Sequence, residues 1–335
     1  MRIAVDVMGG DMGPAEMIPG ALMASEQYGA QVVLVGDEAT TKKVLRANGR
    51  GESEVEIVHA ADSISMDEDP LSAVRHKRDS SLVVAARLVR EGKAAAAVTA
   101  GSTGALVAAG PLVVGRLRGA SRPALATPIP TTRGVPCIIL DIGANPECQA
   151  KNLFEFAVMG SAYASALLGI ENPRIGLLSN GTEASKGTSV VVEANQMLSA
   201  SGLNFIGNIE GRSIFFGEAD VVVMDGFTGN VVLKLAEGLG SAIFHMMKEE
   251  IGESFRAKIG ALLMKPALKS VKKRMDYSEY GGAPLLGLSG LLVKAHGSSN
   301  RKAFANAVRV TSELLNEGLV ENMSRSLSSM DGAGD

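Results

Sequence analysis

Residues 137–145 read CIILDIGAN, an unbroken apolar run that ends in an aspartate and a loop of small residues. A strand with one face in water alternates apolar and polar side chains, whereas a strand buried on both faces is apolar throughout. The run therefore predicts a strand of a parallel sheet that helices cover on both sides. The glycine and asparagine after it predict a tight loop at the end of that strand.

The same pattern, an apolar run followed by a loop rich in Gly, Asn, Asp or Thr and then by helical periodicity, recurs along the chain. It occurs at 2–7, 31–35, 94–99, 137–141, 174–179, 203–206 and 220–224. Strands that alternate with helices predict a doubly wound, mostly parallel α/β sheet. No linker rich in Pro or Ser divides the chain, so we expect residues 1–335 to form one large unit.

Two segments depart from this pattern. Residues 242–280 lack convincing strands and predict a helical arm, in which an apolar stripe is flanked by positive charge and broken near Pro266. Such a surface suits an anionic membrane or an acidic partner, and the alternative is a core-facing helix with a solvated basic face. The small, polar tail at 324–335 predicts disorder. The residues assigned to the surface of the arm are Arg256, Lys258, Leu262, Leu263, Lys265, Lys269, Lys272 and Lys273.

The composition excludes several classes of protein. The net charge of −3 over 335 residues gives no general reason to bind nucleic acid. The two cysteines cannot form a disulfide framework, and no Cys or His cluster has metal-ligand spacing, so we expect no metal and no cofactor. No apolar run is long enough for a transmembrane helix, and the first residues do not resemble a signal peptide. We expect a soluble, cytoplasmic protein.

Three loops have the composition of anion-binding sites: 101–104 (GSTG), 180–188 (NGTEASKGT) and 225–230 (DGFTGN). In a parallel sheet, ligands bind beyond the carboxyl ends of the strands, where the following helices present free N–H groups and a positive dipole end. We place all three loops on one edge of the sheet, where they predict a shared polar cleft. The alternative for each loop is that Gly and Thr only cap a helix.

No nucleotide-binding motif or nucleophilic elbow accompanies these loops. GTEASKGT lacks the GK[ST] of a P-loop, the opening GGDMGP lacks G-x-G-x-x-G spacing, and no G-x-S-x-G follows a strand. Lys186, between two glycines and beside hydroxyls, is the strongest candidate to hold an anion, and the alternative is an exposed surface lysine. His296, in VKAHGSSN, is the only one of the four histidines in a loop of active-site composition.

Eight blocks of the sequence, in order, resemble bacterial phosphate acyltransferases of phospholipid synthesis. They are MRIAVDVMGGDMGP (1–14), TAGSTGALVAAG (99–110), SRPALATPIPT (121–131), LDIGAN (140–145), GTEASKG (181–187), DGFTGN (225–230), YGGAPLLG (280–287) and KAHGSSN (294–300). The resemblance extends over residues 1 to about 320, although Met12 stands where family members often carry His.

The resemblance implies transfer of a long-chain acyl group from the thioester of acyl carrier protein to inorganic phosphate. The acyl phosphate then serves a membrane-bound glycerol-3-phosphate acyltransferase. The family resembles isocitrate and isopropylmalate dehydrogenases and phosphotransacetylases in fold. The resemblance further implies a homodimer without a cofactor, peripherally associated with the membrane.

Under this function, phosphate is itself the nucleophile, so the protein must hold it against the thioester and stabilise an oxyanion. We expect Lys186 and Thr182 to hold phosphate, Asn180 and Asn230 to donate hydrogen bonds, and Asp225 or His296 to move a proton or orient the lysine. Further residues expected at the phosphate or substrate are Gly9, Gly10, Asp11, Ser102, Thr103, Asn145 and Thr228.

Three alternatives remain at this point. A phosphotransacetylase would act on a short acyl-CoA, which the apolar arm disfavours. A noncatalytic, membrane-recruited anion-binding protein would keep the loops without turnover. A dehydrogenase would rest on likeness of fold alone and would need a nicotinamide site that the sequence lacks.

Overall fold

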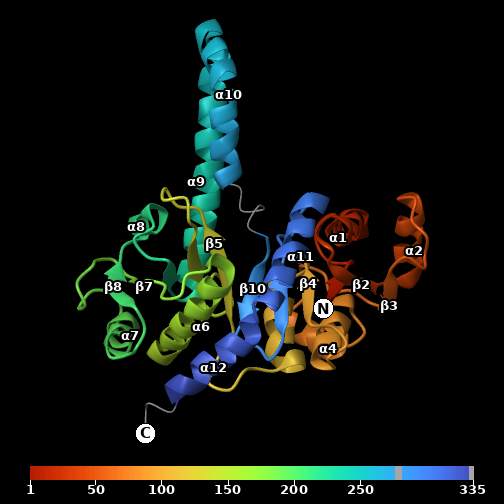
Figure 1. Cartoon of the computed structure of the whole chain (residues 1–335), viewed down its shortest axis with the longest axis horizontal. Coiled ribbons are helices and arrows are strands. Elements are labelled where there is room, and N and C mark those ends of the chain that lie inside the picture. Colours follow the sequence, from red (N-terminus) through yellow and green to blue (C-terminus); the bar gives the residue numbers. More distant parts are fainter. Residues whose placement is uncertain (276–280, 332–335) are drawn as a thin grey trace.

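The structure, a computed structural model, describes residues 1–275 and 281–331 and alternates strands with helices along most of the chain (Figure 1). The described strands are β1 (Arg2–Asp6), β2 (Gln31–Gly36), β3 (Glu56–His59), β4 (Ala96–Thr99), β5 (Ala124–Ile129), β6 (Cys137–Leu140), β7 (Ile175–Leu178), β8 (Phe205–Ile209), β9 (Val221–Val223), β10 (Ala283–Leu286) and β11 (Leu291–Lys294). The described helices are α1 (Pro14–Tyr28), α2 (Glu38–Ala47), α3 (Pro70–His76), α4 (Ser81–Arg90), α5 (Thr103–Ala109), α6 (Ala150–Leu168), α7 (Ser189–Ser199), α8 (Gly211–Phe216), α9 (Gly226–Glu253), α10 (Phe255–Met275), α11 (Arg301–Asn316) and α12 (Leu319–Asp331), with a π-helical segment, η1 (Gly110–Val114), after α5.

Eleven described strands form one sheet in the order β3-β2-β1-β4-β11-β10-β5-β6-β9-β7-β8. Strands are parallel towards both ends of the sheet, and the antiparallel pairings β11–β10, β10–β5 and β5–β6 lie in its middle. The predicted doubly wound, mostly parallel α/β sheet is therefore confirmed. All seven predicted strands are present, and β3, β5, β10 and β11 lie outside the predicted set.

The three antiparallel pairings decide on which edge of the sheet each loop lies. An odd number of reversals separates β4 and β11 from β6 and β9, so the carboxyl ends of these two groups point to opposite edges. Our prediction that the loops 101–104, 180–188 and 225–230 share one edge is therefore wrong. The first and third loops meet instead over one face of the middle strands, as described below.

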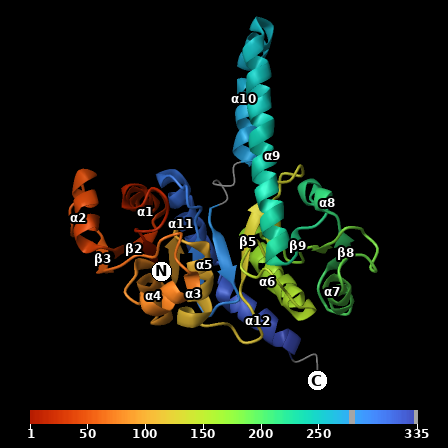
Figure 2. The ribbon, with the colours of Figure 1, turned by 180° about the vertical axis from the view of Figure 1, so that it is seen from behind.

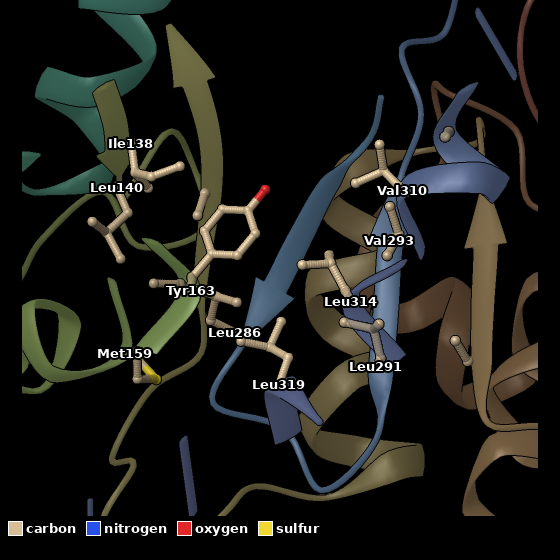
Figure 3. Packing of buried hydrophobic residues seen from close by; sticks show 14 of the residues in the cluster. Ile138, Leu140, Met159, Tyr163, Leu286, Leu291, Val293, Val310, Leu314 and Leu319 are labelled. Atoms are coloured by element: carbon tan, nitrogen blue, oxygen red, sulfur yellow. The ribbon is translucent and has the colours of Figure 1, made fainter. Parts of the chain in front are cut away.

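Side chains of each strand divide between two apolar layers, one on each face of the sheet. Ile3 and Val5 belong to the layer covered by α1, α6, α11 and α12, whereas Ala4 belongs to the layer covered by α4, α5 and α8. Figure 3 shows the first layer, where Tyr163 of α6 lies among Ile138 of β6 and Leu286 of β10. Burial on both faces explains why the strand sequences lack polar alternation.

A hairpin of α9 and α10 stands away from the sheet, as Figures 1 and 2 show from opposite sides. We call it the arm. The helix α9 begins at Gly226, well before the predicted start of the arm at 242, and α10 continues through Pro266, so the predicted break there is wrong. Packing against α9 holds α10 helical across the missing N–H of the proline. The side chains of Lys272 and Lys273 lie outside the described part of the structure.

The predicted disorder of the tail is wrong for residues 324–331, which belong to α12. Leu319, Met323 and Leu327 are spaced four residues apart and are buried in the layer that α6 also covers. This apolar face docks α12 on α6, although serines dominate the rest of the segment. Residues 332–335 lie outside the described residues.

None of the helices in the described ranges is both long enough and apolar enough to cross a bilayer.

Candidate functional site

A cavity of about 410 Å³, which we call the central cavity, lies on one face of the middle strands between the start of α5 and the first turns of α9. Its floor is formed by side chains near the starts of β5 and β10, and its rim comes from loops of both halves of the sheet. The described lining residues are Met66, Gly101, Thr103, Gly104, Leu125, Thr127, Ile142, Gly143, Asn230, Leu233, Lys234, Glu237, Gly281, Ala283, Lys294, His296 and Gly297. The central cavity thus unites the loop after β4, the loop after β11 and the start of α9.

Glycines bring the loops beside the central cavity into contact with each other. A Cβ on Gly9 would lie 2.6 Å from the backbone nitrogen of Gly101, and a Cβ on Gly10, whose φ is +84°, would lie 3.1 Å from the carbonyl oxygen of Gly297. The loop at 8–13 is bare because three backbone segments meet there. Gly9 and Gly10 support the wall of the cavity and are absent from its described lining.

A buried aspartate anchors these loops from below. Asp6 is 1% exposed, and its Oδ2 accepts a hydrogen bond of 2.7 Å from the Thr99 hydroxyl. That hydroxyl oxygen accepts in turn from the backbone N–H of Gly101 at 2.9 Å. Burial raises the pKa of Asp6, and the hydrogen bonds from Thr99, Ser81, Met8 and Gly9 oppose that rise. The chain of bonds fixes the position of Gly101 at the rim.

Lys294, the last residue of β11, places a buried ammonium group in the central cavity. The residue is 9% exposed, and its Nζ donates to the carbonyl oxygens of Ala100, at 3.2 Å, and of Ala295. Burial lowers its pKa to about 8, against the charges of Asp11 and Asp6, which raise it. Lys294 is therefore mostly charged at neutral pH, and an ammonium with two carbonyl partners keeps a third hydrogen to donate.

His296 lies two residues beyond Lys294 on the same rim. Its Nδ1 accepts from the backbone N–H of Ser298 at 3.2 Å and lies 2.8 Å from the Ser298 hydroxyl. Because a backbone N–H only donates, the neutral ring carries its proton on Nε2. Burial has the largest effect on His296 and lowers its pKa, while the charge of Glu237 opposes this shift. The neutral form therefore prevails at pH 7. His296 is thus arranged as a hydrogen-bond donor.

Asn230 and Lys234 face the central cavity from the first turns of α9. Asn230 lies over Gly143, at which a Cβ would be 3.8 Å from the Cβ of Asn230. The Nζ of Lys234 is 3.0 Å from Glu237, and both side chains line the cavity. Since the lysine side chain is 59% exposed, this ion pair is weak and leaves Lys234 able to turn towards an anion.

Asp141 holds the loop after β6 together. Its carboxylate accepts from the backbone N–H groups of Leu125, Gly143, Ala144 and Asn145. The Asn145 amide donates to the carbonyl oxygen of Pro123 and to Asp141, so both amide hydrogens are used within the scaffold. Burial raises the pKa of Asp141 against these hydrogen bonds.

The start of α9 packs directly on this loop. A Cβ on Gly229 would lie 1.8 Å from the Asp141 carbonyl oxygen, and a Cβ on Gly226 would lie 2.7 Å from the Asn145 carbonyl oxygen. The glycines of DGFTGN therefore serve the close approach of α9. Asp225 caps the helix by accepting from the N–H of Thr228 at 2.8 Å, and from its hydroxyl at 2.7 Å.

A second, lateral cavity of about 940 Å³ lies on the other side of the start of α9. It brings together three predicted site residues, Asn180, Asp225 and Thr228, with Cys148. Burial first, and then the charges of Asp141 and Asp225, raise the pKa of Cys148 to about 11. The thiol is protonated at neutral pH and is a poor nucleophile.

Of the remaining predicted residues in the described part of the chain, only Thr103 lines one of the two cavities. Lys186 and Thr182 are exposed on the loop between β7 and α7, and neither is among the described lining residues. Ser102 caps α5 by accepting from the N–H of Ala105 at 3.3 Å, while Thr103 beside it lines the central cavity. Asp11 is exposed and hydrogen-bonds Gly297 through its backbone. Of the four predicted catalytic residues, the structure brings only Asn230 and His296 together.

Lys294, Lys234, Glu237 and Asp6 lie at or beneath the site and are absent from the sequence-based set. Lys294 ends the apolar run LLVK, and a lysine that closes a buried strand is the one signal that points to it. Lys234 and Glu237 follow the pattern of any exposed helix face, so their sequence context does not mark them as site residues. Asp6 likewise resembles an ordinary residue at the end of a strand.

Comparison with known proteins identifies the relatives of the chain. A family model described as "Fatty acid synthesis protein" matches residues 1–322. A phosphate acyltransferase of Moorella thermoacetica is 50% identical over 323 residues, which cover 96% of this chain and 94% of the relative. A phosphate acyltransferase of Pelotomaculum thermopropionicum is 50% identical over 337 residues, which cover 100% of this chain and 98% of the relative.

Solved structures share the fold at low sequence identity. A phosphotransacetylase from Streptococcus pyogenes superposes with a TM-score of 0.65 at 17% identity, covering 96% of this chain and 94% of that one. A 4-hydroxythreonine-4-phosphate dehydrogenase from Klebsiella pneumoniae superposes with a TM-score of 0.53 at 16% identity, covering 93% and 99%. These similarities confirm the expected resemblance of the fold to those of phosphotransacetylases and dehydrogenases.

Proposed function

This chain belongs to the phosphate acyltransferase family, and from that membership we propose that it moves a long-chain acyl group from the thioester of acyl carrier protein to inorganic phosphate. Acyl transfer to phosphate follows from the family, while the carrier-protein donor and the mechanism are our proposals. One observation supports the mechanism most directly. The central cavity collects Lys294, Lys234 and His296, while no Ser or Cys occurs among its described lining residues.

Phosphate is the nucleophile in this mechanism. A phosphate oxygen attacks the thioester carbonyl carbon, a C–O bond forms, and the carbonyl oxygen becomes an oxyanion. The C–S bond then breaks, and the thiolate takes the proton that HPO₄²⁻ carried, so the products are acyl phosphate and a thiol. Because atoms and charge balance without an added base, the protein needs only to position the reactants and stabilise charge.

The lining residues have separate tasks in this step. Lys294 and Lys234 hold phosphate oxygens, since two ammonium groups offset much of the charge of a dianion. The Nε2–H of His296 and the amide of Asn230 donate to the developing oxyanion, which needs neutral donors that are already in place. Asp6 keeps the Gly101 loop fixed beneath them.

The decisive experiment measures acyl phosphate formation from palmitoyl acyl carrier protein and from palmitoyl-CoA, with and without phosphate. We expect acyl phosphate to form only when phosphate is present, and faster from the carrier-protein donor than from palmitoyl-CoA. If neither donor gives product, the proposal is contradicted. If a short acyl-CoA reacts as fast as the carrier-protein donor, a phosphotransacetylase is favoured. Lys294→Met is expected to lower kcat/KM for phosphate by about a hundredfold, the usual order of loss when one charge-stabilising group of an active site is removed.

Lys186, Thr182 and Asn180 remain a second proposed position for phosphate, beside the lateral cavity, with Asp225 as the group that orients the lysine. The two positions are separated by comparing Lys186→Ala with Lys294→Met. If phosphate binds in the central cavity, Lys186→Ala keeps near-normal KM for phosphate. If Lys186→Ala abolishes turnover while Lys294→Met does not, phosphate binds at the β7–α7 loop.

We also propose that the arm meets the acidic carrier protein or an anionic membrane surface. Its tip residue Phe255 is 78% exposed, and Leu262 and Leu263 are 69% and 78% exposed beside the cations Lys258 and Lys265. Apolar side chains with flanking lysines favour the interface of an anionic bilayer. The protein would then be cytoplasmic and peripherally bound to the membrane, where a glycerol-3-phosphate acyltransferase uses the acyl phosphate.

The protein is further proposed to form a homodimer through α9. Val231, Leu235, Leu239 and Ile243 recur at four-residue spacing and are between 42% and 67% exposed. An apolar helix stripe of this kind is typical of a surface covered by another helix. Sedimentation of Leu235→Lys is expected to give monomers, and an unchanged mass for this variant would exclude the stripe as the contact.

A further inference from the structure

An apolar groove of about 910 Å³ runs along α9 from the central cavity towards the tip of the arm. One wall is formed by the end of β5 and by α8, and the other by a face of α9. Small residues of α9, including Gly238 and Ser241, leave space along that face. The apolar side chains among the described lining residues of the groove are Pro128, Ile129, Pro130, Phe215, Leu233, Ala236 and Phe244.

The groove opens into the central cavity. Thr127, Leu233, Lys234, Glu237 and His296 line both of them. The polar groups among these residues gather at the shared end, whereas Phe215 and Phe244 lie in the groove alone. A ligand that fits both spaces therefore has a polar reacting end and a long apolar remainder.

We propose that this groove binds the acyl chain of the donor, with the thioester carbonyl at the shared end beside His296. This inference rests on the proposed function and names where its apolar substrate lies. The carbonyl then falls within the ring of donors in the central cavity, and the chain points away from phosphate. Apolar walls favour the chain because each buried methylene group strengthens binding about fourfold.

The length of the groove favours a long chain over a short one. Its lining on α9 extends from Leu233 to Lys248, a rise of about 22 Å at 1.5 Å per residue. A two- or four-carbon acyl group would occupy only the end next to the cavity. His245 and Lys248 at the far end place polar groups where the chain would end or leave towards a lipid surface.

The test narrows the groove without touching the catalytic groups. Gly238→Phe and Ser241→Phe each add a ring to a lining position, and a Cβ on Gly238 meets no described atom within 4 Å, so the helix accepts it. The matched control is Gly252→Phe, in the same helix and equally open, but absent from the groove lining. Displacement of a fluorescent fatty acid by palmitic acid measures binding independently of catalysis.

We expect both groove variants to weaken palmitic acid binding by about tenfold or more, the contribution of a few methylene groups. They should also lower the ratio of kcat/KM for palmitoyl over hexanoyl carrier protein by a similar factor. Gly252→Phe should leave the affinity and the ratio at their wild-type values. An unchanged ratio and affinity in both groove variants overturns the proposal.

Failure of the groove and failure of the proposed function give different results. If the wild-type protein makes no acyl phosphate, the function fails, and palmitic acid binding still tests the groove. If the wild-type protein is active but both groove variants keep the palmitoyl preference, only the groove assignment fails. A change of sedimenting mass in the groove variants with unchanged palmitic acid binding identifies the groove as a contact between copies and also overturns the proposal.

Discussion

Two residues near the end of β11, Lys294 and His296, give the central cavity its electrostatic character. Lys294 supplies a buried positive charge that solvent screens little, and His296 supplies a neutral donor whose tautomer the backbone N–H of Ser298 selects. His296 could be singled out from its loop, whereas the one sequence signal for Lys294 is its place at the end of a strand. It follows an apolar run whose burial on both faces becomes evident only when β11 is paired between β4 and β10.

The activity should fall with rising pH as Lys294 loses its proton. Burial sets its pKa near 8, below that of an ordinary lysine, so the ammonium form prevails below pH 8 and is lost above it. We expect kcat/KM for phosphate to decrease about tenfold per pH unit beyond that value. Lys294→Arg, whose guanidinium stays charged, should flatten this alkaline limb. A wild-type profile that stays level up to pH 9.5 would contradict the assignment.

Tyr163 provides a stability prediction at the same scale. Its hydroxyl is fully buried in α6 and has no hydrogen-bond partner among the described residues (Figure 3). Burial raises its pKa far above the ordinary range, so the group stays neutral. Tyr163→Phe is expected to raise the free energy of unfolding by up to about 1 kcal/mol, because it removes an unsatisfied polar atom.

Urea denaturation measures this change, and Tyr28→Phe, at a 45% exposed position, is the control that should leave stability unchanged. A loss of more than about 1 kcal/mol in Tyr163→Phe would show that the hydroxyl has a partner, such as a buried water.

At the scale of elements, α9 lines both cavities and the groove. Its first turn is capped by Asp225 and separates the two cavities, one side of it lines the groove, and another carries the exposed stripe that includes Leu235. The sequence indicates the cap and the arm. It does not indicate that Gly226 and Gly229 face another backbone, since their neighbours come from the loop at 141–145, far away in the chain.

Gly229→Ala tests that contact. The added methyl would overlap the carbonyl oxygen of Asp141, so the start of α9 must move away from β6. We expect a loss of about 2–3 kcal/mol in the free energy of unfolding, together with lower activity. Gly238→Ala, in the same helix with open space around it, should instead gain about 0.5–1 kcal/mol. Equal effects of the two variants on urea denaturation would contradict the packing argument.

The arm yields a prediction that separates its two proposed partners. Charge reversal at Lys258, Lys265 and Lys269 should weaken use of the acidic carrier protein and binding to anionic vesicles alike. Replacement of Leu262 and Leu263 by serine should weaken vesicle binding by about tenfold or more while leaving KM for the carrier protein unchanged. Vesicle sedimentation and steady-state kinetics measure the two effects. If neither set of variants changes either readout, the arm is purely structural.

At the scale of the whole molecule, the buried runs CIILD, VVLVG and VVVMD suffice to predict a covered, mostly parallel sheet. The antiparallel pairings in the middle of the sheet cannot be predicted from such runs. Their strands β5 (ALATPI) and β10 (APLL) contain prolines, which disfavour a strand assignment. The same pairings explain why the loops of 101–104 and 225–230 meet over a face of the sheet. Strand periodicity predicts the layers, whereas the location of the site depends on strand order.

Strand order also decides when the site is assembled during synthesis. In the folded protein β4 (residues 96–99) pairs with β11 (residues 291–294). One edge of β4 therefore stays unpaired until residues 291–294 have been synthesised. The intervening chain, including β5 to β9 and the arm, leaves the ribosome first. The central cavity, which needs Gly101, Asn230 and Lys294 together, is therefore completed among the last events of translation. Until then, an unpaired edge of β4 is open to chaperones and to other nascent chains.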